Sequence, residues 1–109
     1  MKDNMFTANT DFGTYECYPS VGEYNNGHIA IQLFCDEGPL ATITVNVDGI
    51  ENFEEDFSCL DTNNCPWVEE FVEEYNLGTF EGIYLNSGYC MYPVYRLNRT
   101  EINLYSAGK

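Results

Sequence analysis

The side chains of this sequence that could do chemistry are above all carboxylates, and they far outnumber the cations. The chain has eighteen aspartates and glutamates among 109 residues but only four lysines and arginines, which gives a formal net charge of −14. No lysine or arginine occurs between Asp3 and Tyr95, whereas seventeen carboxylates lie along those 93 residues. Small domains ordinarily mix both signs, because a single-sign field repels itself and destabilises the compact state. We therefore expect the negative field to serve binding to a basic surface, either a nucleic-acid-binding groove or another cationic protein face.

The carboxylates are most concentrated in the middle of the chain, where ten of the eighteen lie between Asp48 and Glu74. If residues 65–75 form a helix, Glu69 with Glu73 and Glu70 with Glu74 are like-charge pairs, each of which costs about a few tenths of a kcal/mol. A merely solvated helix face is the ordinary alternative, but it leaves the missing compensating cations unexplained. The predicted partner-binding acids are the loop carboxylates (Glu51, Glu54, Glu55, Asp56) and the helix carboxylates (Glu69, Glu70, Glu73, Glu74).

A second candidate surface is aromatic. Tyr84, Tyr89, Tyr92 and Tyr95 lie in two expected strands near the end of the chain. Strand alternation is expected to put Tyr89 and Tyr95 on one face and Tyr92 on the other. Some of these side chains belong to the core, whereas an exposed tyrosine beside carboxylates is a good interface anchor. Tyr89 and Tyr92 complete the predicted partner-binding set.

Catalysis and metal binding find little support in the residues. The only histidine, His28, opens an expected strand beside a turn and is predicted to face solvent. The five cysteines, at positions 17, 35, 59, 65 and 90, form no C-x-x-C pair and are expected to be reduced, largely buried thiols. The acidic loop from Asp48 to Asp56 offers oxygen ligands but lacks the alternating positions of a calcium-binding EF-hand loop. We expect no enzyme activity, no metal and no cofactor.

Turn signals such as Asn25-Asn26-Gly27 and Asp36-Glu37-Gly38-Pro39 divide the chain into short elements. Apolar residues that alternate with polar ones predict half-buried antiparallel strands over 28–34 and 40–47. The stripe of Trp67, Phe71 and Tyr75 predicts one helix over 65–75, packed on the sheet face of Ile29, Ile31, Ile43 and Val45. Further extended segments are expected at 12–24, 57–60, 79–85 and 89–95. The predicted fold class is α+β: an antiparallel sheet of about five strands with a single amphipathic helix on one face.

The length and composition predict a single domain over residues 1–109. Its ordered core is expected to span about 12–95, with a loosely held N-terminus and a loosely held C-terminal tail over 96–109. The first residues contain no apolar run of the kind that directs export, and no apolar run approaches eighteen residues, so we expect a cytoplasmic protein without membrane insertion.

Several stretches between about residues 12 and 95 resemble one family. They are Tyr24-Asn25-Asn26-Gly27, Ala30-Ile31-Gln32-Leu33, Gly38-Pro39-Leu40-Ala41, Thr44-Val45-Asn46-Val47, Asp61-Thr62-Asn63-Asn64-Cys65-Pro66-Trp67-Val68-Glu69-Glu70-Phe71 and Ser87-Gly88-Tyr89-Cys90-Met91-Tyr92-Pro93-Val94-Tyr95. They resemble small acidic proteins of unassigned function carried on bacterial plasmids, conjugative elements and phages. Some of those proteins are anti-CRISPR proteins that inhibit type II RNA-guided nucleases. The tail after Arg96 departs from the pattern, and no functional residue is carried across from the family.

The resemblance and the charge together imply an inhibitor of a bacterial defence system, acting in the cytoplasm of the bacterial host. The expected partner is a CRISPR effector nuclease or another basic defence protein, onto whose nucleic-acid-binding groove the acidic surface docks. Direct nucleic-acid binding and membrane binding are not expected, and the oligomeric state is left open. The alternative is a small-ligand binder that sequesters a nucleotide defence signal, which would need Arg96, Arg99 or main-chain amides to hold the anion.

Overall fold

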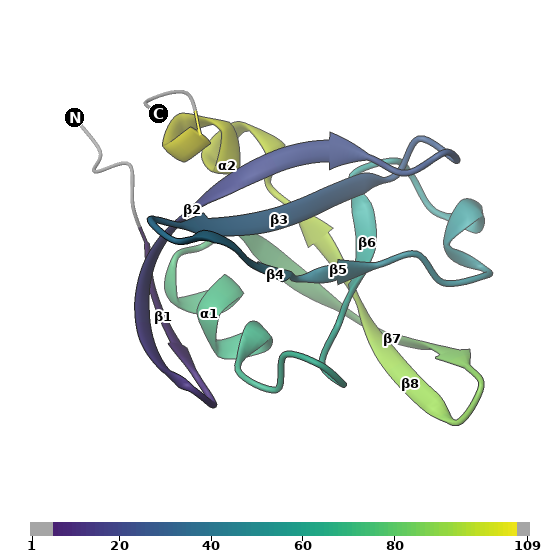
Figure 1. Ribbon diagram of the computed structural model, residues 1–109. Coiled ribbons are helices and arrows are strands. Elements are labelled where there is room, and N and C mark those ends of the chain that lie inside the picture. Colours follow the sequence, from purple (N-terminus) through teal and green to yellow (C-terminus); the bar gives the residue numbers. More distant parts are fainter. Residues whose placement is uncertain (1–5, 107–109) are drawn as a thin grey trace.

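Two four-stranded antiparallel sheets make up the fold, and the computed structural model describes it for residues 6–106 (Figure 1). The first sheet contains, in spatial order, β1 (Phe6–Thr10), β2 (Gly13–Glu23), β3 (Ile29–Cys35) and β4 (Gly38–Thr42). The second contains, in spatial order, β5 (Thr44–Val45), β6 (Phe57–Leu60), β8 (Cys90–Leu97) and β7 (Gly78–Ser87). The helical elements are the 3-10 helix η1 (Ile50–Asn52), α1 (Val68–Glu74) and α2 (Arg99–Ser106).

The α+β class and the antiparallel pairing are confirmed, but the strands form two sheets instead of one. The segment predicted as a single strand over 40–47 is divided at Ile43. The Ile43 amide donates to the Ile31 carbonyl in the first sheet, at 3.0 Å, and the Ile43 carbonyl accepts from the Asp61 amide beside the second sheet, at 2.9 Å. The apolar alternation continues through this point, so the sequence pattern alone does not reveal the change of sheet.

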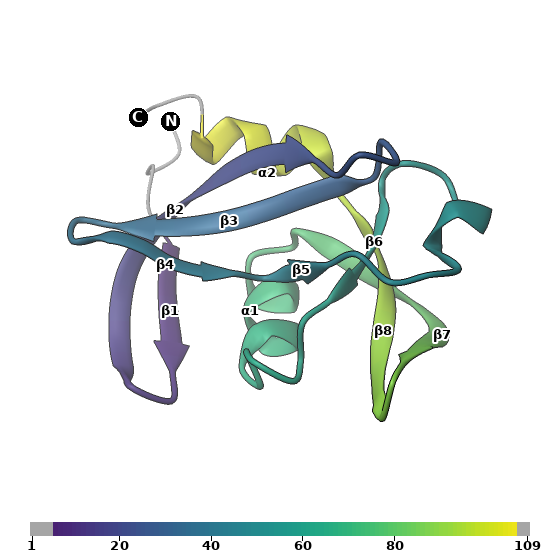
Figure 2. The ribbon, with the colours of Figure 1, turned by 45° about the vertical axis from the view of Figure 1, so that its right-hand side comes forward.

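The helix α1 lies beneath β3 and β4, between β1 and the hairpin of β7 and β8 (Figures 1 and 2). Its apolar stripe enters the main core, where Val68, Phe71 and Val72 are buried. The Phe71 ring packs edge-on against the Phe6 ring of β1, with centroids 5.4 Å apart. The helix therefore links β1 to the second sheet.

The helix α1, predicted over 65–75, begins at Val68 and ends at Glu74. Asn76 adopts the left-handed conformation (φ 58°), and the Leu77 amide donates to the Val72 carbonyl at 2.8 Å, which closes the last turn. Gly78 is required for a different reason. A Cβ atom at this position would lie 2.8 Å from Leu97 Cδ2 and 2.9 Å from the Arg96 carbonyl, so β7 can approach β8 closely only with glycine there.

The expected ordered core of 12–95 was wrong at both ends. Strand β1 contributes Phe6 and Ala8 to the core, and α2 contributes Ile102, all three fully or almost fully buried. The first turn of α2 is capped by Asn98, whose Oδ1 accepts from the Glu101 amide at 3.1 Å. Among the described side chains of α2, Ile102 is buried, and the helix packs against β2. The parts of both predicted ends at 1–5 and 107–109 lie outside the described residues.

Candidate functional site

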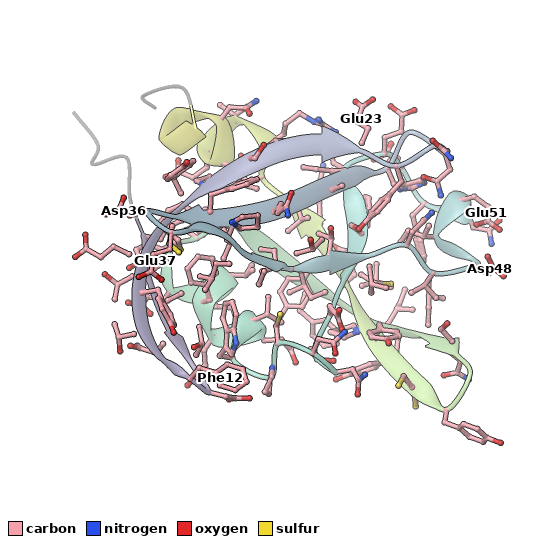
Figure 3. The ribbon with its side chains drawn as sticks, in the orientation of Figure 1. Phe12, Glu23, Asp36, Glu37, Asp48 and Glu51 are labelled. Carbon is pink, nitrogen blue, oxygen red and sulfur yellow. The ribbon has the colours of Figure 1, made fainter. Side chains whose placement is uncertain are left out.

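The loop carboxylates lie at one end of the molecule, around η1, and all four are exposed. Figure 3 shows Glu51 there beside Asp48, with both side chains pointing away from the strands. Local contacts hold two of the loop carboxylates: Glu51 Oε1 accepts from the Gly49 amide at 3.0 Å, and Asp56 Oδ1 accepts from Arg99 Nε at 3.1 Å. The ion pair with Arg99 removes part of the negative field at Asp56. This end therefore presents chiefly Asp48, Glu51, Glu54 and Glu55.

Three of the helix carboxylates, Glu70, Glu73 and Glu74, are exposed and line a groove of about 300 Å³ between α1 and β1. The rest of the groove lining is Thr7, Asn9, Trp67 and Phe71. Within the described residues, no lysine or arginine forms an ion pair with these carboxylates. The groove therefore combines negative charge with the aromatic side chains of Trp67 and Phe71, which suits a cationic side chain that packs on an aromatic ring.

Glu69 and Glu73 face the second sheet, contrary to the expectation of a wholly solvent-exposed acidic helix face. The hydroxyl of Tyr95 donates to Glu69 Oε1 at 2.7 Å and lies 2.9 Å from Glu73 Oε2. The Tyr95 side chain is fully buried. Burial raises the pKa of Tyr95 well above its usual range, and the two adjacent carboxylates raise it further. Spacing at i and i+4 thus lets both carboxylates reach one phenol.

The structure does not unite the two acidic groups into one surface. Both ribbon views place η1 and α1 on opposite sides of β6 (Figures 1 and 2). A single flat partner surface would meet one group or the other. The helix carboxylates are the stronger candidate, because they border a groove and no cation of the described chain neutralises them.

The two predicted tyrosine anchors, Tyr89 and Tyr92, differ in their exposure to solvent. Tyr89 is fully exposed in the two-residue turn between β7 and β8, where Ser87 pairs with Cys90. Tyr92 was wrongly assigned to the binding surface: it is 8% exposed and belongs to a second core cluster with Val47 and Val94. Strand alternation places Tyr92 on the face of β8 opposite to Tyr95, and that face packs against the second core cluster. The predicted single sheet had no second core, so the burial of Tyr92 was not expected.

Sequence reasoning missed exposed apolar residues in the same hairpin. Large apolar side chains with substantial exposure occur there at five positions, which we call the hairpin patch: Phe80, Ile83, Tyr84, Tyr89 and Met91. Three residues of β7, Glu81 to Ile83, lie opposite Val94 alone, because the register shifts between Phe80 and Tyr84. The sequence signal for this bulge is Gly82, which has a positive φ of 79° and interrupts the apolar alternation.

His28 was expected to face solvent, but it is buried, with 3% of its surface exposed. Its Nδ1 donates to the carbonyl of Phe57 at 2.8 Å, so the ring connects the start of β3 to β6.

The five cysteines are free thiols, of which Cys17, Cys59 and Cys65 are buried. Burial raises the pKa of Cys17 to about 12 and that of Cys59 and Cys65 to about 11. Among the described residues, no three histidine, cysteine or acidic side chains gather as a group able to hold a metal ion.

Both arginines of the described chain line one polar cavity of about 340 Å³ between β7, β8 and the start of α2. Asn98 and Thr100 contribute amide and hydroxyl groups to its lining. The Arg99 guanidinium is already engaged there, with Asp56 at 3.1 Å and with Glu23 at 3.8 Å. Arg96 lies over the Phe57 ring, 5.9 Å from its centroid, and is exposed.

The comparisons with known proteins give a family and no activity. In the described residues, no helix has the length and apolar character needed to cross a membrane. No curated protein and no solved structure matches the chain. A family model described as a domain of unknown function, DUF4313, matches residues 19–108. This match covers most of the chain, which therefore belongs to the DUF4313 family.

Proposed function

We propose that this protein is a non-enzymatic inhibitor of a bacterial defence system, and specifically an anti-CRISPR protein carried by a phage or another mobile element. It acts in the cytoplasm of the bacterial host. Its acidic surface docks onto the basic groove of a CRISPR effector nuclease that otherwise holds DNA or guide RNA. The inhibitor blocks the groove by occupancy, so one molecule inactivates one nuclease without turnover.

The observation that carries this proposal is how little of the exposed negative charge in the described chain is paired with a cation. Fourteen of the seventeen carboxylates in the described chain are exposed, and the ion pairs found among residues 6–106 involve Arg99 alone. A basic groove gains much of its affinity for nucleic acid by neutralising phosphates, so fixed carboxylates can compete for it without imitating any base sequence. The same charge repels DNA and RNA, which argues against direct nucleic-acid binding.

The helix carboxylates are the part of this surface that we assign to the groove. Glu70, Glu73 and Glu74 lie on one short rigid element, packed against the core through Val68, Phe71 and Val72. Glu74 lies in the last turn, where the helix dipole disfavours acids, and it takes no part in the Tyr95 contact. Lysine would stabilise the helix more at this position, so an acid there fits a binding role better than a structural one.

A cleavage assay tests the proposal directly. The purified protein is added to type II effector nucleases loaded with guide RNA, before the target DNA is supplied. We expect cleavage and DNA binding to fall together as the inhibitor approaches one equivalent, and the inhibition to weaken as salt is raised from about 0.1 M to about 0.5 M, because salt screens exposed charges. Full cleavage by every effector at excess inhibitor would remove the CRISPR nuclease as the target.

A second candidate function rests on the cavity that Arg96 and Arg99 share. An otherwise acidic chain places two cations, two amide side chains and two hydroxyl groups around one polar space, which is the chemistry required to hold a phosphate group. A sponge for a nucleotide defence signal would use this cavity. It ranks second because Asp56 and Glu23 already neutralise Arg99. Calorimetric titration with cyclic and linear nucleotides decides between the candidates: submicromolar binding, lost in Arg96→Gln, would reverse the ranking.

A further inference from the structure

We propose that the hairpin patch binds a segment of the partner that carries arginine or lysine side chains beside apolar side chains. This inference rests on the proposed function, since it adds an apolar anchor to the acidic surface assigned there. The patch contains five of the six large hydrophobic side chains that are exposed in the described chain, the sixth being Phe12. Exposed apolar side chains gathered in this way, unlike scattered ones, mark interaction surfaces.

Strand pairing places the central residues of the patch on one face of the hairpin. Phe80 pairs with Tyr95, Tyr84 pairs with Pro93, and Asn86 pairs with Met91. Paired residues share a face, so Phe80, Tyr84 and Met91 lie on the face that carries Tyr95. The rings agree with this register: the Phe80 centroid lies 5.5 Å from that of Tyr84 and 5.6 Å from that of Tyr95. The opposite face, with Leu85 and Tyr92, is covered by the second core cluster.

The charges at the border of this face define the chemistry of the occupant. The Tyr95 hydroxyl, beside the Phe80 ring, touches Glu69 and Glu73 of α1, so carboxylates stand at the inner border of the patch. Glu81 lies exposed within β7 itself. An occupant with cationic groups beside apolar ones can pair with these acids while its apolar side chains cover Tyr84 and Met91. An acidic occupant is repelled.

The same charge argues against a second copy of this chain as the occupant. Two copies would bring net charges of −14 together, with Glu81 and the helix carboxylates of each facing the other. Addition of a partner strand along the free edge of β7 is also disfavoured. The bulge from Glu81 to Ile83 breaks the regular row of amide and carbonyl groups that a new strand needs. The occupant therefore lies on the face of the hairpin.

Two synthetic peptides probe the patch without any defence nuclease. In one, arginine alternates with leucine, and in the other serine replaces each leucine, so the two carry equal charge. Binding is followed by amide NMR shifts at about 0.15 M salt, where exposed charges beyond about 8 Å are largely screened. We expect the leucine peptide to bind at least about tenfold more tightly, equivalent to about 1.4 kcal/mol. The largest shifts should fall on Phe80, Tyr84 and Met91.

Variants locate the effect. Tyr84→Ser with Met91→Ser should reduce binding of the leucine peptide to the level of the serine peptide. Phe12→Ser is the matched control, because Phe12 is 89% exposed in the turn between β1 and β2, away from the hairpin (Figure 3). It should leave binding unchanged. Thermal melts verify that the variants fold, and Tyr89→Ser, in the exposed turn, serves as a second patch variant that should also weaken the leucine peptide.

Three results would overturn the inference: equal binding of the two peptides, an equal loss in Phe12→Ser, or shifts confined to the loop carboxylates. A concentration-dependent dimer in sedimentation that Tyr84→Ser with Met91→Ser dissolves would also overturn it, because a second copy would then occupy the patch. The peptide assay and the nuclease assay fail separately. Patch binding without nuclease inhibition removes the proposed function alone, whereas inhibition that survives in the patch variants removes this inference alone.

Discussion

The hydroxyl of Tyr95 lies 2.7 Å from Glu69 Oε1, so a fully buried phenol on β8 is tied to a carboxylate on α1. Glu73 Oε2 lies 2.9 Å from the same oxygen atom. The contact joins the second sheet to the helix that carries the proposed binding acids. It divides those acids into a structural pair, Glu69 and Glu73, and an unattached pair, Glu70 and Glu74, and this division decides which substitutions can test binding.

Charge reversal at Glu70→Lys with Glu74→Lys is expected to weaken inhibition at least about tenfold, because it places cations where a basic groove must dock. Stability should change by no more than about 0.5 kcal/mol, since both side chains are exposed and lie outside the Tyr95 contact. Inhibition is measured by nuclease cleavage and stability by urea unfolding.

The matched control for this charge reversal is Asp36→Lys with Glu37→Lys, which makes the same change of net charge in the exposed turn between β3 and β4 (Figure 3). The control should retain inhibition. Equal losses in both double variants would show that net charge acts without a local site, and full activity in both would exclude the α1 surface.

Tyr95→Phe is expected to lower the free energy of unfolding by about 1 to 3 kcal/mol, the usual effect of losing a buried hydrogen bond to a charged group. The ring remains, so packing against Phe80 is kept and the loss comes from the hydroxyl. Urea unfolding near neutral pH gives the value. Tyr84→Phe is the control, since Tyr84 is 49% exposed, and it should melt like the parent. A Tyr95→Phe variant as stable as the parent would show that the contact contributes nothing.

Stability is expected to fall as pH rises above about 9, because of the buried thiols. The pKa of an unperturbed cysteine is 9.0, whereas burial raises the pKa of Cys17 to about 12 and that of Cys59 to about 11. Above pH 9 the unfolded chain releases thiol protons that the folded chain retains, so each such thiol contributes a slope approaching about 1.4 kcal/mol per pH unit. The raised pKa of Tyr95 acts in the same direction above about pH 10.

Urea unfolding at pH 8 and at pH 10 measures this loss, and Cys59→Ala should make the decrease smaller. The folded protein should also shield Cys17 and Cys59 from a thiol reagent, whereas Cys35 and Cys90, which are half-buried, react first. A stability that is flat between the two pH values would contradict the burial of these thiols.

Substitutions at Phe71 and Trp67 are expected to have different consequences, although both belong to one helical stripe. Phe71 is 3% exposed and contacts the rings of Phe6 and Tyr75, so Phe71→Ala should cost about 3 to 5 kcal/mol. Trp67 is only half-buried and lines the acidic groove, so Trp67→Ala should cost less and should weaken inhibition in a protein that still folds. Thermal melts and cleavage assays on both variants check this. If the melting temperature of Trp67→Ala were as low as that of Phe71→Ala, Trp67 would be a core residue and not part of the binding groove.

Features that depend on neighbouring residues could be predicted from the amino-acid sequence. Alternation of Ile29, Ile31 and Leu33 identified β3, because side chains in a strand point to opposite faces in turn. The stripe of Trp67, Phe71 and Tyr75 identified α1, and Asn25-Asn26-Gly27 identified the turn before β3. The net charge also follows from the sequence alone, and with it the proposal of a basic partner.

Features that depend on residues far apart in the chain became visible in the folded structure. The division of the 40–47 segment at Ile43 created a second core, which buries Tyr92. The approach of Tyr95 to α1 engaged Glu69 and Glu73, and the packing of Ile102 ordered the end of the chain as α2. Each outcome depends on which face a distant element covers. Local periodicity specifies that an element has an apolar face but leaves its covering to the packing of the whole chain.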